Sequence, residues 1–173
     1  CGGDVMDINF FDPKYLTEAA RDDSSFGLSD DNRMAFTTND PNLIIAEVSN
    51  PANVLVQFIP VDHNIVVKDT LGQDVSMSDA MIYTPDKSPK KDIHFIELKD
   101  QMANWRQKAI SQLESTIQIF SQNHVLEDFR YRVATAANKA HPQFNFSTKE
   151  DCQAFRKRNK FRLNICSQID IKQ

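Results

Sequence analysis

The chain has 173 residues, of which 40% are hydrophobic and 25% are charged, and its formal net charge is −4. This length suits one domain with a full hydrophobic core and is short for two, so we expect a single domain over 1–173. No run approaches the ~20 apolar residues of a membrane-spanning helix, and none resembles a signal peptide. The totals therefore favour an ordinary globular protein and exclude one built on membrane-spanning helices.

The cysteines and the first residue bear on the compartment. Cys152 and Cys166 have no metal-ligand spacing, and with Cys1 they make an odd count. We therefore expect free thiols in a cytoplasmic, bacterial or phage-like context, with a Cys152–Cys166 bridge as the alternative. The start at Cys1 is best explained as a truncated end or a lost start residue. A lipidated cysteine, an N-terminal nucleophile and a cut from a toxin or multidomain protein are the other interpretations.

The N-terminal segment, 1–48, predicts one helix in an otherwise irregular and acidic stretch. Residues 13–21 favour a short helix, because Asp12 can cap it and a proline suits its first position. Residues 22–42 are polar and rich in turn formers, which predicts a loop. The apolar run at 43–48 does not distinguish between helix and strand.

The middle of the chain predicts a series of short apolar strands, followed by a long helix. One apolar stripe along that helix, at spacings of three and four residues, consists of Trp105, Ala109, Leu113, Thr116, Ile117 and Phe120. The predicted strands cover 54–59, 64–68, 79–83 and 93–99, with a turn at 71–74, a proline-containing connector at 85–91 and the helix over 102–122.

The C-terminal part, 136–173, is basic and predicts one further helix, which Ser147 or Thr148 would cap and which ends near 159. Alternating side chains predict strands at 128–134 and 162–169. The whole order is helix, strands, helix, strand, helix, strand. It predicts an α/β (α+β) protein.

Asp79 and the triplet Glu97-Leu98-Lys99 are the most informative residues. A strand alternates its faces with a period of two, so Glu97 and Lys99 point to the same side. If their strand and the preceding one pair as an antiparallel hairpin, Asp79 lies beside both. Two carboxylates alone would repel each other, whereas a divalent cation between them and a nearby ammonium group make the cluster tolerable. This is the outline of a site for metal-assisted phosphodiester hydrolysis.

The same residues resemble the motif of the PD-(D/E)xK nuclease superfamily, which includes many restriction endonucleases and DNA-repair nucleases. Ser78-Asp79 stands in the PD position without its proline, and Glu97-Leu98-Lys99 fits the ExK position. The resemblance covers about 50–135, the expected catalytic core. It implies a restriction-endonuclease-like core, in which a central mixed β-sheet is flanked by helices, and a nuclease that acts on DNA, with RNA as the alternative substrate.

The resemblance also implies roles for individual residues. Asp79, Glu97 and the backbone carbonyl of Leu98 would hold Mg²⁺ or Mn²⁺, because oxygen ligands suit a hard cation. Lys99 would orient or help deprotonate a metal-bound water and offset charge on the phosphate. Gln112 would bond to Lys99 or to a water on the metal.

Charge is unevenly distributed along the chain. Residues 1–80 carry 4 Lys/Arg and 14 Asp/Glu, whereas residues 139–173 carry 8 and 3. A nuclease must approach a polyanion, so we expect a basic cluster to bind nucleic acid. A solvated helix end is the alternative interpretation, because cations suit the helix dipole there. The basic cluster consists of Arg156, Lys157, Arg158 and Lys160.

Several other residues are weaker candidates. Glu18 or Glu47 would serve as an additional acidic ligand of the metal. Trp105 is expected in the core rather than as a stacking platform for bases. The four histidines are scattered through the chain, which argues against a zinc site. Many relatives in the superfamily dimerise, so a homodimer is a further expectation.

Two other functions stay open. The fold could serve as a catalytically inactive binding or assembly module, in which Asp79 is a turn residue and Glu97 and Lys99 form an exposed ion pair. The chain could also be a surface protein lipidated at Cys1, and only then would a membrane be a partner.

Overall fold

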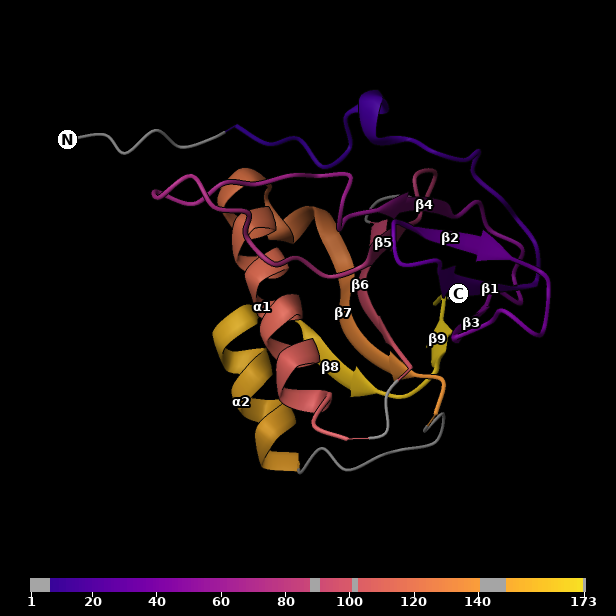
Figure 1. Cartoon of the computed structure of the whole chain (residues 1–173). Helices are drawn as coiled ribbons and strands as arrows, with labels where there is room; N and C mark the ends of the chain where they lie inside the picture. Colours follow the sequence, from indigo (N-terminus) through magenta and orange to yellow (C-terminus); the bar gives the residue numbers. More distant parts are fainter. Residues whose placement is uncertain (1–6, 88–90, 101–102, 141–148, 173) are drawn as a thin grey trace.

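A computed structural model describes residues 7–87, 91–100, 103–140 and 149–172, which form two mixed β-sheets and two α-helices (Figure 1). The expected mixture of helix and strand is confirmed. None of the helices in these ranges is long and apolar enough to cross a membrane.

The larger sheet has five strands in sequence order, and it carries both helices. Its first three strands form an antiparallel meander, and its last three run parallel. The crossovers between parallel strands pass through α1 (Arg106–Asn123) and α2 (Lys149–Asn159). The strands are β4 (Gln57–Pro60), β5 (Ala80–Tyr83), β6 (Lys91–Lys99), β7 (Phe129–Asn138) and β8 (Arg162–Ile165).

The smaller sheet joins the two ends of the chain. Its order is β2-β1-β3-β9, and only the β3–β9 pair is parallel. The C-terminal strand therefore lies beside a strand from the first third of the sequence. The strands are β1 (Ser25–Asp30), β2 (Ala35–Thr38), β3 (Ala46–Ser49) and β9 (Gln168–Asp170).

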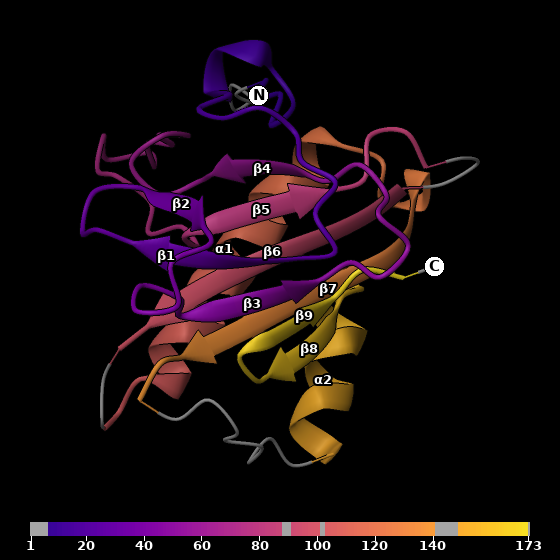
Figure 2. The same cartoon turned by 90° about the vertical axis from the view of Figure 1, so that its right-hand side faces the viewer.

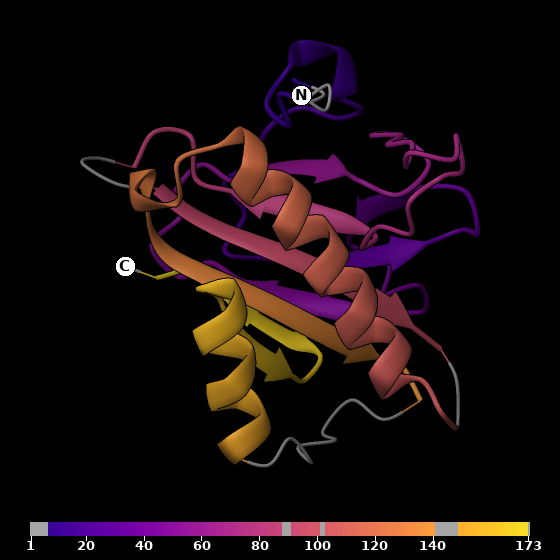
Figure 3. The same cartoon turned by 90° about the vertical axis from the view of Figure 1, so that its left-hand side faces the viewer.

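The three layers are helices, five-stranded sheet and four-stranded sheet, in that order. Figure 3 shows α1 and α2 across one face of the large sheet, and Figure 2 shows β1 and β3 in front of its other face. Successive side chains of β6 pack into two hydrophobic cores, one on each face of the large sheet. Phe95 packs against Phe120 of α1, and Ile96 packs in the cluster that contains Leu28 of β1. The period-two pattern of a strand buried on both faces explains this division.

The predicted helix at 13–21 is only a single 3-10 turn, η1 (Pro13–Tyr15). Asp12 does cap it, because its side chain accepts a hydrogen bond from the Lys14 N–H. Beyond Leu16 the chain is extended, and Arg21 pairs with Val56 beside the sheet. A helix as short as the predicted one is marginal without packing. The pairing of Arg21 with Val56 therefore determines the extended conformation of the chain beyond Leu16.

Three other element predictions are wrong in whole or in part. The loop expected at 22–42 contains β1 and β2, whose buried residues include Phe26 and Leu28. The strand expected at 64–68 is irregular, with Val66 exposed. The strand expected at 162–169 divides into β8 and β9, which belong to different sheets. Only β9 pairs with a distant strand, β3, whereas β1 and β2 form a local hairpin whose polar composition conceals its buried residues.

The other predicted elements are present, with shifted ends. The strands at 54–59, 79–83, 93–99 and 128–134 correspond to β4 to β7, and the helices correspond to α1 and α2. The turn at 71–74 is present, and Gly72 supplies its positive φ of 77°. The caps proposed at Ser147 and Thr148, part of the connector at 85–91 and Cys1 lie outside the described residues. A short 3-10 turn, η2 (Leu126–Asp128), precedes β7.

Candidate functional site

The site lies where β5 begins and β6 ends. The antiparallel register pairs Ala80 with Ile96, which brings Asp79 beside Glu97. The Leu98 N–H donates a hydrogen bond of 2.7 Å to Asp79 Oδ2. The hairpin expected from the sequence therefore forms, and it brings both carboxylates together.

Glu97 is almost completely buried, with 1% of its surface exposed. Its Oε1 lies 3.4 Å from Lys99 Nζ, whereas its Oε2 has no hydrogen-bond partner among the described residues. Glu97 and Lys99 are two positions apart on β6, on the face that looks toward α1. One oxygen of a buried carboxylate is thus available to an additional ligand.

Burial and mutual repulsion govern the electrostatics of the carboxylate pair. Burial raises the pKa of Glu97 well above its usual value, neighbouring Asp79 raises it further, and Lys99 opposes both effects. Burial also raises the pKa of Asp79, while its hydrogen bonds with Glu97 and the Leu98 N–H act in the other direction. The protein alone therefore disfavours two negative charges here, and a cation between them would favour both.

Gln112 connects Lys99 to helix α1. Lys99 Nζ donates a hydrogen bond of 3.0 Å to Gln112 Oε1, and Gln112 Nε2 donates one of 3.2 Å to Ser76 Oγ. Thr116, one turn further along the helix, accepts a 2.7 Å hydrogen bond from the Ser78 N–H. The hydrogen bond expected between Gln112 and Lys99 is present, and the helix holds the segment before Asp79 in place.

These residues line an open cleft of about 470 Å³ between the helix layer and the four-stranded sheet. Four lining residues that sequence reasoning missed carry charge: Asp30, Asp62, Asp100 and Lys139. Burial raises the pKa of Asp62, and His63 beside it acts in the opposite direction. The full lining is Ser29, Asp30, Asn32, Leu43, Ile45, Asp62, Asp79, Glu97, Leu98, Lys99, Asp100, Gln112 and Lys139.

A sequence signal existed for some of the missed residues. Asp100 directly follows the Glu-x-Lys triplet, and Asp62 follows the predicted strand that became β4. Asp30 lies at the end of β1, in a segment predicted to be a loop, and only the packing of the two sheets brings it to the cleft. No local pattern indicates that placement.

The donor set at the bottom of the cleft fits a hard cation. Asp79 and Glu97 supply carboxylate oxygens, one of which is buried and unpartnered among the described residues. Oxygen ligands of this kind suit Mg²⁺ or Mn²⁺, which keeps several waters. Within the described ranges, no group of three or more His, Cys, Asp and Glu side chains is close enough to hold a metal ion. The protein would therefore supply two carboxylates and leave the other positions to water, substrate and backbone.

The additional acidic candidates lie elsewhere. Glu18 accepts hydrogen bonds from the backbone N–H and the hydroxyl of Thr37, which ties it to β2. Glu47 is exposed on β3, where it accepts a hydrogen bond from Ser25 Oγ. Neither lines the cleft. Trp105 is buried in the helix-side core, as expected.

The basic cluster is exposed at the end of α2 and does not line the cleft. Arg158 forms an ion pair of 2.6 Å with Glu114 of α1, so its guanidinium also holds the two helices together. Arg156, Lys157 and Lys160 are exposed beside it. Cys152 and Cys166 are free thiols, as expected.

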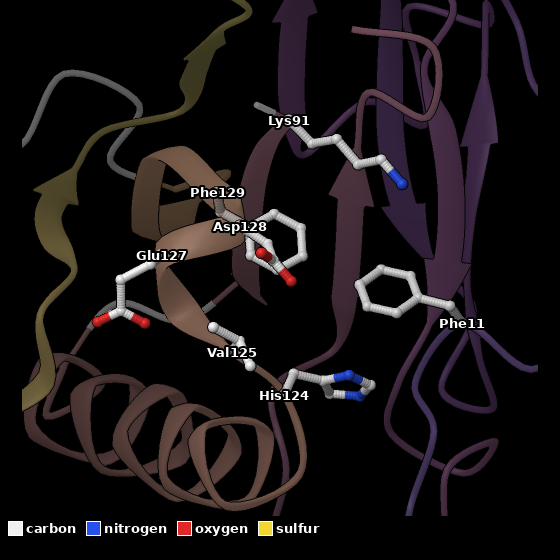
Figure 4. Close-up of a pocket in the computed structure, with 7 residues that line it drawn as sticks. All are labelled: Phe11, Lys91, His124, Val125, Glu127, Asp128 and Phe129. Atoms are coloured by element: carbon white, nitrogen blue, oxygen red, sulfur yellow. The ribbon is translucent and has the colours of Figure 1, made fainter. Parts of the chain in front are cut away.

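A second pocket, of about 450 Å³, lies at the opposite end of β6 (Figure 4). The figure shows Lys91, Phe11 and Asp128 directed toward the same space, with the His124 ring below them. His124 Nε2 accepts a 3.1 Å hydrogen bond from the Phe10 N–H, which fastens the N-terminal segment to the end of α1. Burial lowers the pKa of His124, in agreement with this acceptor role. The lining is Phe11, Lys91, His124, Val125, Glu127, Asp128 and Phe129.

Comparisons of the chain with protein-family models, with curated proteins and with solved structures found no match. The chemistry of the cleft therefore rests on its own residues and geometry.

Proposed function

We propose that this protein is a metal-dependent nuclease that hydrolyses phosphodiester bonds of DNA, with RNA as the alternative substrate. The observation that carries the proposal is the buried carboxylate pair of Asp79 and Glu97 beside Lys99, with Glu97 Oε2 unpartnered among the described residues. The pair lies in a cleft rather than in a sealed core, so a ligand can reach it.

A purely structural role explains this arrangement poorly. A buried ion pair stabilises a protein only when its charges balance and its remaining hydrogen-bonding capacity is used. Here two carboxylates share one ammonium group, and one carboxylate oxygen has no partner in the described chain. A buried excess of negative charge is costly unless a cation or a proton neutralises it. Perturbed carboxylates in a cleft are typical of functional sites.

The chain's own residues suit hydrolysis of a phosphodiester. Asp79 and Glu97, with the Leu98 carbonyl, would hold Mg²⁺ or Mn²⁺, which supplies Lewis acidity and a more acidic bound water. Lys99 Nζ, between Glu97 and Gln112, would donate to a phosphate oxygen and offset its growing negative charge. Gln112 would act as a positioning residue, because it restricts where the ammonium group can point.

The order of elements supports a restriction-endonuclease-like core as part of the same proposal. The meander of β4, β5 and β6 is followed by α1 and by the parallel strand β7, and the acidic motif lies on β5 and β6. This is the arrangement that the resemblance to the PD-(D/E)xK superfamily implies. The chain differs in its first helix, which is reduced to the 3-10 turn η1, and in the four-stranded sheet that covers one face.

The deciding experiment combines cleavage with metal binding. Wild type, Asp79→Ala and Lys99→Ala would be incubated with plasmid, linear duplex, single-stranded DNA and RNA in Mg²⁺ or Mn²⁺. We expect cleavage that requires the metal and disappears in both variants. Calorimetry would report one or two metal ions bound by wild type and by Lys99→Ala, and none by Asp79→Ala.

A matched control is Asp128→Asn, which removes a carboxylate from an exposed position away from the cleft. It should retain both cleavage and metal binding. A wild-type protein that binds neither Mg²⁺ nor Mn²⁺ and cleaves nothing would contradict the proposal. In that case the fold would be better explained as a binding or assembly module.

A further inference from the structure

The cleft has two walls of different origin. One wall belongs to the five-stranded sheet and to α1, and it carries the proposed catalytic groups Lys99 and Gln112. The opposite wall belongs to the segment around the four-stranded sheet, including Asp30 at the end of β1 and Leu43 before β3. A substrate that reaches the carboxylates through this cleft therefore passes between α1 and the end of β1.

The reactive groups lie deep relative to these walls. Glu97 is 1% exposed, Asp79 is 7% exposed, and the Lys99 side chain is 11% exposed. The cleft measures about 470 Å³, which falls in the range of roughly 300–1,000 Å³ typical of sites for small molecules. Such a volume accepts a short stretch of unpaired chain, whereas a duplex presents its phosphates on a broad, stiff surface.

Charge favours the same kind of substrate. Asp30, Asp62 and Asp100 stand in the cleft beside the proposed catalytic pair, and Lys139 is the additional cation there. Its ammonium group donates to the backbone carbonyl of Asn42, at the four-stranded side of the cleft. A duplex carries one negative charge for about every 1.7 Å of its axis, so docking it across this mouth would bring many phosphates toward carboxylates. A single strand brings fewer phosphates into the cleft, and its flexible backbone can bend away from the carboxylates.

We infer that the cleft takes an unpaired strand of nucleic acid and discriminates against continuous duplex. This inference rests on the proposed nuclease function and adds a substrate class to it. The four-stranded sheet then acts as a selectivity wall, because it narrows access to groups that the five-stranded sheet and α1 position.

The test compares substrates of one sequence, with wild type in Mg²⁺ or Mn²⁺: a linear unpaired strand, a circular unpaired strand and the blunt duplex. We expect either unpaired form to be cut at least about tenfold faster than the duplex. Equal or faster cutting of the duplex that Lys99→Ala abolishes would overturn the inference and leave the nuclease proposal intact. Metal binding without cleavage of any substrate would also overturn it, and absence of both would remove the nuclease proposal itself.

A pair of variants tests the wall directly. Asp30→Asn removes one negative charge from the cleft, and Glu47→Gln removes one from an exposed position on the same sheet. We expect Asp30→Asn to raise cutting of duplex relative to unpaired strand, on the order of threefold. Glu47→Gln should leave this ratio unchanged. An unchanged ratio in Asp30→Asn would contradict the role of the wall's charge in selectivity.

Discussion

The two ends of strand β6 carry buried carboxylates in different electrostatic settings. At its start, Asp92 is completely buried and pairs with a single lysine, Lys87, at 3.1 Å; its Oδ1, like Glu97 Oε2, has no hydrogen-bond partner among the described residues. At its end, Asp79 joins Glu97, and the two share Lys99. One carboxylate with one ammonium is balanced, whereas two with one ammonium leave an excess negative charge. The two ends therefore differ in charge balance: one is a balanced pair, and the other has an excess negative charge that the proposed cation would neutralise.

The largest effects should come from removing each lysine: loss of Lys99 should lower cleavage, and loss of Lys87 should lower stability. Lys99→Met should lower cleavage by at least about 10³-fold, because the group that offsets phosphate charge is lost. Lys87→Met should leave Asp92 buried without its ammonium partner and cost about 3 kcal/mol of unfolding free energy. Urea unfolding and initial cleavage rates would be measured on both variants. A Lys99→Met protein that lost more stability than Lys87→Met would reverse the comparison.

The next effect concerns His94, which lies between the two ends and faces the four-stranded sheet. Complete burial lowers its pKa to about 4, and neither ring nitrogen has a hydrogen-bond partner in the described chain. Because the folded pKa lies below the usual value of about 6.5, stability is fully present above pH ~6.5 and falls as the pH drops toward 4. The loss should reach about 3 kcal/mol.

Chemical unfolding of wild type and His94→Leu across pH 4 to 7 would isolate this contribution, since the other titrating groups are common to both proteins. The stability advantage of His94→Leu should grow as the pH falls, because leucine cannot take up a proton. Parallel curves for the two proteins would show that His94 is not held neutral by its burial.

A smaller effect on stability is expected at Glu97. Removing a buried charged side chain usually destabilises a protein, but here the substitution should stabilise it. The pKa of Glu97 is raised in the folded state, so its ionisation costs stability as the pH rises above the unfolded value of about 4.5. In metal-free protein at pH 8, Glu97→Gln should therefore increase the unfolding free energy. Glu114→Gln, which loses a partly exposed ion pair with Arg158, should decrease it slightly.

With Mg²⁺ present, wild type should become more stable than Glu97→Gln, the reverse of the order expected in metal-free protein. An ion that binds only the folded protein stabilises it by about 2.7 kcal/mol at one hundred times its dissociation constant. Wild type should gain this increment, whereas Glu97→Gln should gain little, and thermal melts with and without Mg²⁺ would show it. If Glu97→Gln destabilised the metal-free protein instead, Glu97 would be a structural partner of Lys99, as Asp92 is of Lys87.

The part of the site that the sequence predicts is the part made by local geometry. Asp79, Glu97 and Lys99 come together through one hairpin, whose alternation can be read from residue types alone. Gln112 is expected because the resemblance to the superfamily implies a polar helix residue beside the site, and the structure places it in contact with Lys99. The half of the cleft that carries the proposed catalytic residues therefore needs only β5, β6 and α1, which are all predicted from the sequence.

The opposite wall is different because it depends on distant partners. β3 pairs with β9 across more than a hundred residues, and Asp30 reaches the cleft only when the two sheets pack. The polar stretch at 22–42 hides β1 and β2, since turn formers and outward polar side chains outnumber Phe26 and Leu28. β1 and β2 pair with each other as a short hairpin, and the packing of their buried residues on the large sheet overrides these local preferences.

The smallest effect on cleavage is expected at Gln112, in the half of the cleft that is predicted from the sequence. Gln112→Ala removes the acceptor that restrains the Lys99 ammonium group and the donor to Ser76, but leaves the carboxylate pair intact. We expect cleavage to fall about tenfold, equivalent to about 1.4 kcal/mol in the barrier, with metal affinity unchanged. Gln112→Glu can still accept from Lys99 and should recover part of the rate, which a merely structural glutamine would not predict. If the alanine variant were fully active, Lys99 would be positioned by Glu97 alone, and the difference between the two ends of β6 would reduce to the second carboxylate.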